Sequence, residues 1–214
     1  MSTPAPLLHD GPETGPVLLL AHGAGAPMDS GFMTEMAGRL ADLGIHVVRF
    51  EFAYMGARRT DGKRRPPPRM PVLIEEFSDL ISRFAGRKVF IGGKSMGGRV
   101  ASMIAADPDR SGDIAGLVCL GYPFHPPGKP DSLRTAHLPA IACPVLIVQG
   151  ERDPFGNKDD VSGYRLPAQF EVCWSAFGNH DLAPPKKSGR TADENWSAAA
   201  TAIARFMGET SSVE

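Results

Sequence analysis

Short apolar runs of strand length alternate along this chain with stretches whose apolar residues recur at helical spacing. The strand-like runs are 17–21, 45–52, 88–92, 114–120, 144–149 and 170–174. The helix-like stretches are 30–43, 70–84, 99–106 and 193–207. Nearly continuous apolar strands that alternate with helices are typical of a parallel sheet buried on both faces. The pattern therefore predicts an α/β fold with a mostly parallel sheet of about six strands and helices on both faces.

No internal repeat and no linker interrupts this alternation. A chain of 214 residues is long enough for one sizeable core and marginal for two. We therefore expect a single domain over 1–214, in which 1–16 and 209–214 form irregular tails. The Pro-rich loop 122–139 is short and carries no clear helical pattern, so no large lid is expected there.

Charge and terminal pattern restrict the class of partner and the location. The formal net charge is −1, so no overall field favours nucleic acid or an anionic membrane. The segment 1–16 lacks a charged region followed by an apolar core, and the run 17–21 is far too short to span a bilayer. These features predict a cytoplasmic protein that binds neither nucleic acid nor a membrane.

The three cysteines, Cys119, Cys143 and Cys173, lie in or beside apolar runs. That placement is typical of small buried side chains in a reducing compartment. A catalytic thiol is the alternative, but none of the three has a Gly-rich turn or a helix start beside it. Their spacing resembles no zinc site, so neither a metal nor a cofactor is expected.

The most specific motif is the run Gly92-Gly93-Lys94-Ser95-Met96-Gly97-Gly98 between a strand-like and a helix-like stretch. A chain that turns sharply from a strand into a helix strains the residue at the apex and leaves no room for side chains two positions away. This is the pattern of a nucleophile elbow, which lifts a serine hydroxyl above the sheet. It predicts that Ser95 is a nucleophile and that an acid and a histidine follow, in that order, each after a strand.

Asp153 and His180 occupy those two places. Asp153 follows the run 144–149, and His180 follows the last strand-like run, 170–174. We expect His180 to take the proton from Ser95 and Asp153 to orient the imidazole. Glu151 is the rival acid, and a turn-capping histidine is the alternative role for His180. Asp181 directly follows the histidine and is expected to be solvated.

Two backbone N–H groups are needed for the oxyanion. One is expected from Met96, at the start of the helix after Ser95. The other is expected from the small-residue loop after the first strand, with Ala24 preferred and Gly25 as the alternative. His22, which begins that loop, is expected to hydrogen-bond to it rather than to act in catalysis.

The segment 55–69 is expected to be a loop, and it is locally basic although the chain as a whole is not. Asp61 is its only acid, and its cations are Arg58, Arg59, Lys63, Arg64, Arg65 and Arg69. A solvated mobile loop is one interpretation, and an electropositive rim for an anionic substrate or partner is the other. The candidate substrate contacts are Gly25, Lys94, Arg58 and Arg59. Lys94 either favours an anionic substrate or points away from it.

With these residues in view, the chain resembles an α/β-hydrolase of minimal size from residue 17 to 207. More narrowly, it resembles small bacterial hydrolases related to the hydrolase-like domain of testis-expressed protein 30 and of a non-specific lethal complex subunit. The similarity lies in the segments 21–30, 94–99, 58–69 and 152–156. Dienelactone hydrolases and small carboxylesterases are more distant relatives.

The resemblance implies a serine hydrolase whose Ser-Asp-His triad is Ser95, Asp153 and His180. It would cleave a small-molecule ester or thioester through an acyl-serine intermediate. Members of this fold can also lose catalysis and serve as interaction modules, for which the basic loop would be the surface. The oligomeric state is left open, with a homodimer as one alternative.

Overall fold

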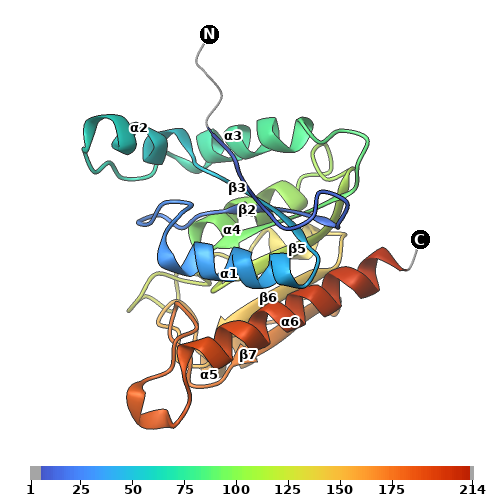
Figure 1. Cartoon of the computed structure of the whole chain (residues 1–214). Helices are drawn as coiled ribbons and strands as arrows, with labels where there is room; N and C mark the ends of the chain where they lie inside the picture. The colour runs from blue at the N-terminus through green and yellow to red at the C-terminus, as the bar shows by residue number, and fades with distance from the viewer. Residues whose placement is uncertain (1–5, 213–214) are drawn as a thin grey trace.

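The computed structural model describes residues 6–212, which form one sheet of seven strands covered by helices (Figure 1). The strand order is β1-β3-β2-β4-β5-β6-β7, and every neighbouring pair is parallel except β1 and β3. The strands are β1 Leu8–Asp10, β2 Val17–Ala21, β3 His46–Phe50, β4 Val89–Lys94, β5 Ile114–Leu120, β6 Val145–Gly150 and β7 Phe170–Ser175. The α-helices are α1 Gly31–Asp42, α2 Ala53–Asp61, α3 Met70–Ser82, α4 Met96–Ala105, α5 Lys158–Ser162 and α6 Ala192–Ser211.

Helices cover both faces of the sheet, as the alternating pattern predicts. Helices α3 and α4 lie on one face, and α1 and α6 lie on the other (Figure 1). Strand β2 shows why its sequence is apolar throughout. Its Leu19 packs into the core under α3 and α4, whereas Leu18 and Leu20 pack towards α1 and α6, and all three side chains are fully buried.

Strand β1 is the one strand of the described sheet that the sequence did not predict, and it lies inside the segment that was expected to be an irregular tail. Leu8–Asp10 pairs antiparallel with β3, and the guanidinium of Arg49 binds the Asp10 carboxylate through Nε at 2.9 Å and Nη2 at 3.0 Å. A three-residue strand is too short to give an alternating pattern, which is why the sequence did not reveal it. At the other end α6 continues to Ser211, so the expected tail is helical at 209–211. Residues 1–5 and 213–214 of the two expected tails lie outside the described part.

Helix α2 is a second departure, because a loop was expected over 55–69. Tyr54 and Met55 are buried and anchor its first turn, and Gly62 ends the helix with a positive φ of 69°. The backbone N–H of Ala53 donates to the Glu76 carboxylate of α3 at 2.8 Å, which ties the start of α2 to its neighbour. The arginines and glycine of this segment hide its helical pattern.

The connections leave one edge of the sheet open. Between β5 and β6 the chain forms only one short 3₁₀ helix, Leu138–Ala140, and no large lid. The carboxyl ends of the parallel strands β2, β4, β6 and β7 meet at this edge, so the loops that follow them are brought together there.

Candidate active site

Ser95 sits at the apex of the turn between β4 and α4. Its backbone has φ 52° and ψ −114°, a left-handed conformation that is strained for a residue with a side chain. The flanking glycines make this turn possible. A Cβ on Gly93 would lie 2.6 Å from the carbonyl carbon of Gly97, and one on Gly97 would lie 2.6 Å from the backbone oxygen of Ala21. The local geometry is therefore that of the elbow indicated by the sequence.

Three side chains predicted to act together form one hydrogen-bonded chain. Ser95 Oγ lies 2.8 Å from His180 Nε2, and His180 Nδ1 lies 2.8 Å from Asp153 Oδ2. Asp153 is fully buried and accepts further hydrogen bonds from Gln149 Nε2 at 3.0 Å and from the N–H of Phe155 at 2.9 Å. A carboxylate only accepts, so Nδ1 of His180 carries the ring proton and Nε2 is free to accept from the serine hydroxyl.

Glu151, the rival acid, is engaged elsewhere. Its carboxylate accepts from Lys158 Nζ at 2.9 Å and from the backbone N–H of Phe177 at 2.9 Å. These contacts, the lysine first, lower the pKa of Glu151. The structure thus brings Asp153 rather than Glu151 to the histidine.

Hydrogen bonds from the side chains of His22 and Tyr54 hold the loop after β2 in place. His22 Nδ1 donates to the backbone oxygen of Gly23 at 2.6 Å, and its Nε2 accepts from the N–H of Phe52 at 3.2 Å. Burial lowers the pKa of His22, which keeps the ring neutral and permits this division of roles. The Tyr54 hydroxyl donates to the backbone oxygen of Ala24 at 2.9 Å. His22 therefore holds the loop, as expected, and does not approach Ser95.

A cavity of about 280 Å³ opens over Ser95. Ala24 and Gly25 form one side of it, and His180 lies on another. Met96 is the first residue of α4, so its backbone N–H has no acceptor within the helix. The rest of the lining includes the apolar side chains of Phe32, Met33 and Phe155 and the charged side chains of Lys94 and Asp181.

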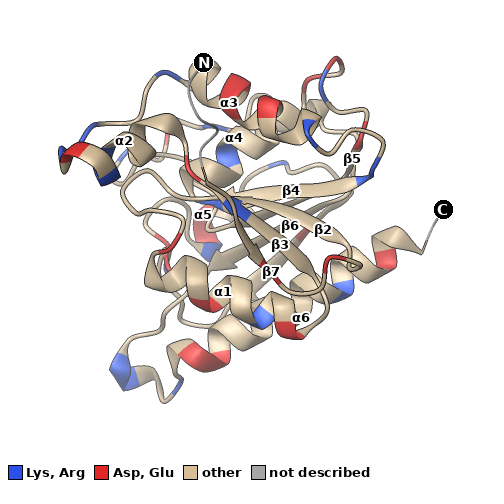
Figure 2. Ribbon diagram, turned by 45° about the horizontal axis from the view of Figure 1, so that its top comes forward, with Lys and Arg blue, Asp and Glu red and all other residues tan. Residues whose placement is uncertain are grey.

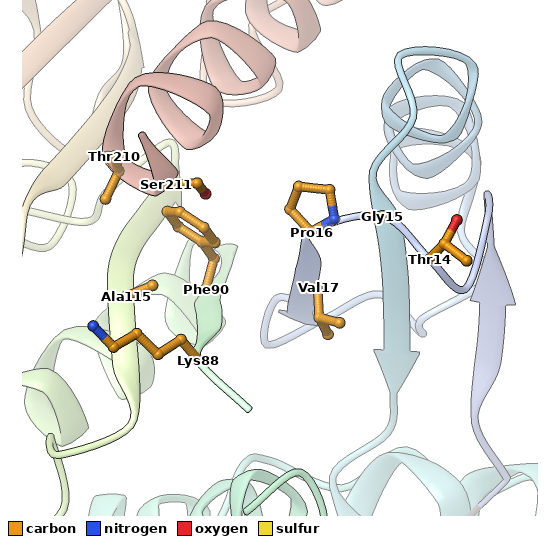
Figure 3. A pocket seen from close by; sticks show the side chains of 9 residues that line it. All are labelled: Thr14, Gly15, Pro16, Val17, Lys88, Phe90, Ala115, Thr210 and Ser211. Atoms are coloured by element: carbon orange, nitrogen blue, oxygen red, sulfur yellow. The ribbon is translucent and has the colours of Figure 1, made fainter. Parts of the chain in front are cut away.

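A larger cavity, of about 310 Å³, lies at the opposite edge of the sheet (Figure 3). Its lining includes Val17, which begins β2, Ala115 near the start of β5, and Ser211 at the end of α6. It is therefore separated from Ser95 by the length of the strands, and it contributes nothing to this site.

Lys94 is turned inward and holds the histidine loop. Its Nζ donates to the backbone oxygen of His180 at 2.6 Å, lies 3.4 Å from Asp181 Oδ1 and stands 5.4 Å from the centre of the Phe32 ring. Burial lowers the pKa of Lys94, although Asp181 and Asp153 act in the opposite direction. Asp181, whose side chain is 62% exposed, is thus partly solvated as expected but also faces this ammonium.

The two basic-loop candidates differ in what surrounds them. Arg59 donates to both oxygens of Glu51, at 2.7 Å and 2.6 Å, and to Asp29 at 2.8 Å. These contacts raise the pKa of Arg59, and they occupy its Nε and Nη2 groups with carboxylates of the same chain. Arg58 instead lines a separate cavity of about 190 Å³ beside Ala24 and Gly25. Residues of both signs lie close together on and around α2 (Figure 2).

Three further residues support the site although no role in it was predicted for them from the sequence: Tyr54, Gln149 and Phe155. Gln149 is fully buried and its amide nitrogen reaches Asp153, Tyr122 O and Gly156 O. The Phe155 ring lies on the His180 ring, with centroids 4.3 Å apart. An amide in an otherwise apolar strand was a signal for Gln149, because a buried amide requires partners. Phe155 lies in the segment 152–156 that carries the resemblance, but no sequence signal pointed to Tyr54.

A second serine–histidine contact joins Ser102 of α4 to His137. Ser102 Oγ is 2.8 Å from His137 Nε2, but the hydroxyl also contacts Arg99 O at 2.7 Å and the serine is fully buried. Burial lowers the pKa of His137 to about 4. Within residues 6–212 no carboxylate contacts this histidine, so the pair lacks the third member that Ser95 and His180 have.

The three cysteines are neutral thiols held in largely buried positions. Burial raises the pKa of Cys143 to about 11 and also raises that of Cys173 and Cys119, which disfavours a thiolate. From residue 6 to 212 there is no cluster of three or more His, Cys, Asp or Glu side chains that could hold a metal ion. No helix in the same range is both long and apolar enough to cross a bilayer.

Comparisons with known proteins agree with the fold. Residues 14–208 match the model of a family described as an alpha/beta hydrolase domain. Among solved structures, a dienelactone hydrolase from Anabaena variabilis is 18% identical and superimposes with a TM-score of 0.70 over 95% of this chain and 91% of its own. An alpha-beta serine hydrolase homologue from Coxiella burnetii is 18% identical, with a TM-score of 0.68 over 92% and 90%.

A third structure, described as an α/β serine hydrolase without a lid, comes from Xanthomonas campestris. It is 18% identical, with a TM-score of 0.66 over 94% of this chain and 88% of its own. Identities this low show the fold alone. The predicted fold class is confirmed, whereas the narrower resemblance to the testis-expressed protein 30 group stays a prediction.

Proposed function

The chain belongs to the alpha/beta hydrolase domain family, and on that premise we propose that it is a serine hydrolase cleaving a carboxylic ester or thioester. The observation that carries the proposal is the chain of two 2.8 Å contacts from Ser95 Oγ through His180 to Asp153. A serine hydroxyl is a weak nucleophile unless a base takes its proton, and this arrangement supplies the base.

In the acylation step, Ser95 Oγ attacks the carbonyl carbon of the substrate while His180 Nε2 takes the hydroxyl proton. The imidazolium is stabilised by Asp153, which is buried and already accepts a hydrogen bond from the Nδ1–H group of His180. Collapse of the tetrahedral intermediate expels the alcohol or thiol, which receives the proton from Nε2. Water then attacks the acyl-serine by the same route, releasing the acid and restoring Ser95.

The oxyanion of that intermediate needs donors that are in place before the reaction. We assign them to the N–H groups of Met96 and Ala24. Met96 begins α4, and Ala24 lies in the wall of the Ser95 cavity in the loop that His22 and Tyr54 brace. Removal of one such donor in other hydrolases costs on the order of 10²–10³ in kcat.

The cavity favours an acyl group that is small or that extends beyond the cavity into solvent. Its volume of about 280 Å³ is at the low end for a ligand site, and its wall of Phe32, Met33 and Phe155 suits an uncharged hydrocarbon. No large lid from the described residues 6–212 covers it, and one of the similar structures is itself described as lacking a lid. A substrate can therefore extend beyond the cavity into solvent.

Steady-state hydrolysis tests this function. The substrates are a chain-length series of p-nitrophenyl esters and the matching acyl-thioesters. We expect turnover of short acyl chains by the wild-type protein and loss of about 10³-fold or more in Ser95→Ala. A folded wild-type protein no faster than Ser95→Ala across both series would reject the proposal.

A further inference from the structure

A second cavity adjoins the Ser95 cavity and is lined by three arginines. It has a volume of about 190 Å³, and Ala24 and Gly25 line both cavities. On the far side of this shared loop the walls are Tyr54 and Met55 of α2 together with Arg58, Arg64 and Arg65. The two cavities thus meet at the segment to which we assign an oxyanion donor.

The arginines of this loop fall into two groups. Arg65 forms an ion pair with Asp61, and Arg59 is held by Glu51 and Asp29. Across residues 6–212 the guanidinium groups of Arg58 and Arg64 make no ion pair and no hydrogen bond. The carboxylates of Asp61, Glu51 and Asp29 are therefore already paired with Arg65 or Arg59. Two positive charges at the second cavity remain without a counter-ion.

The boundary between the cavities is open. A Cβ built on Gly25 meets no heavy atom within 4 Å, so a substrate can pass over this residue without a clash. The loop itself is fixed, because the Tyr54 hydroxyl donates to Ala24 O at 2.9 Å and burial raises the pKa of Tyr54 to about 12. A rigid, low boundary lets one molecule occupy both cavities.

We propose that Arg58 and Arg64 bind an anionic group, a carboxylate or a phosphate, on a substrate whose scissile carbonyl lies at Ser95. The proposal rests on the proposed function for the carbonyl and on the second cavity for the anion. The uncharged arm lies against Phe32 and Met33, and the anionic arm crosses Gly25. Guanidinium groups suit this task because they pair with both anions in bidentate geometry.

Anion binding is tested first without catalysis, in the Ser95→Ala protein. Inorganic phosphate and succinate are titrated separately while the Arg Nε–Hε resonances are followed by NMR at constant ionic strength. We expect the resonances of Arg58 and Arg64 to shift with at least one anion, and which anion shifts them identifies the source. Arg58→Gln and Arg64→Gln should each weaken binding by roughly five- to tenfold.

Arg69→Gln is the matched control, because it removes the same charge from the same loop but Arg69 lines neither cavity. Equal weakening by all three variants would mean a diffuse field and would overturn the site. Absence of any shift at Arg58 and Arg64 with both anions would also overturn it. The basic loop would then be assigned to binding an acidic protein partner.

Kinetic measurements then distinguish a failure of the anion subsite from a failure of the proposed hydrolase activity. p-Nitrophenyl hydrogen adipate carries a carboxylate, and its methyl ester is the neutral counterpart. We expect Arg58→Gln and Arg64→Gln to lower kcat/KM for the acid five- to tenfold relative to the ester, with Arg69→Gln close to wild type. Equal effects on both substrates would overturn the subsite while leaving the hydrolase intact. Anion binding without any turnover would keep the subsite and reject the hydrolase.

Discussion

The ammonium of Lys94 donates to the backbone oxygen of His180 at 2.6 Å, so the residue before the serine holds the loop that carries the histidine. The two segments are 86 positions apart in the chain, and this contact joins them independently of the Ser95–His180 hydrogen bond. The position of the imidazole relative to Ser95 therefore depends on a buried cation.

Replacement of Lys94 by methionine tests this positioning role. Lys94→Met keeps the length of the side chain but removes the donor to His180 O. We expect kcat for a neutral p-nitrophenyl ester to fall by about tenfold or more while KM changes by less than about twofold, because the histidine is displaced and the apolar cavity is kept. Stability should change little, since burial already disfavours this charge.

Lys158→Met is the control for that variant, because it removes an exposed ammonium that binds Glu151 and lies outside the cavity over Ser95. Its kinetics should match wild type. Unchanged kcat in Lys94→Met, or a change confined to KM, would show that Lys94 does not position His180.

The choice between two acids gives a second prediction. Asp153→Asn should lower kcat by about 10³- to 10⁴-fold, because an amide no longer stabilises the imidazolium or fixes its tautomer. Glu151→Gln, two residues away, loses only contacts to Lys158 and to the N–H of Phe177 and should keep kcat within about threefold. Steady-state kinetics with one ester decide between them, and the reverse ranking would assign the acid to Glu151.

His137 gives a prediction for stability against pH. Burial lowers its pKa from 6.5 to about 4, so between these values the unfolded chain binds a proton that the folded protein does not. The contribution of neutral His137 to stability is therefore complete above pH 6.5 and is lost progressively as the pH falls towards 4.

Urea unfolding of wild type and His137→Gln at pH 7 and pH 5 measures this effect. The free energy of unfolding should fall more steeply in the wild type than in the variant. The pKa values of His22 and His46 are also lowered by burial, but those residues are present in both proteins and their effect cancels. Equal losses in the two proteins would mean that His137 is protonated in the folded state near its ordinary pKa.

The parts of the fold that the sequence revealed are those with long, regular patterns. Continuous apolar runs predict the six parallel strands, because strands buried on both faces need apolar side chains on both. Strand β1 has three residues and depends on the Arg49–Asp10 ion pair, which joins distant parts of the chain. Helix α2 is stabilised by tertiary contacts of Tyr54 and Glu76, and its own composition gives little sign of them.

The site divides in the same way. The elbow is a local constraint, since Gly93 and Gly97 are required by backbone contacts that a sequence motif can encode. Which cations form ion pairs within the chain depends on residues that are distant in the sequence. Arg58 and Arg59 are neighbours in the sequence, yet Arg59 is paired with Glu51 and Asp29, whereas Arg58 makes no ion pair and lines the cavity beside Ala24 and Gly25. The inward turn of Lys94 likewise depends on the His180 backbone, so neither outcome could be derived from charge patterning.

Labelling by a fluorophosphonate tests the central claim, that Ser95 is an activated nucleophile, most directly. The modified residue is located by peptide mass spectrometry in wild type, His180→Ala and Ser102→Ala. We predict a label on Ser95 in the wild type and in Ser102→Ala, and at least a hundredfold slower labelling in His180→Ala. A folded wild-type protein whose Ser95 stays unlabelled, or a label on Ser102, would contradict the claim.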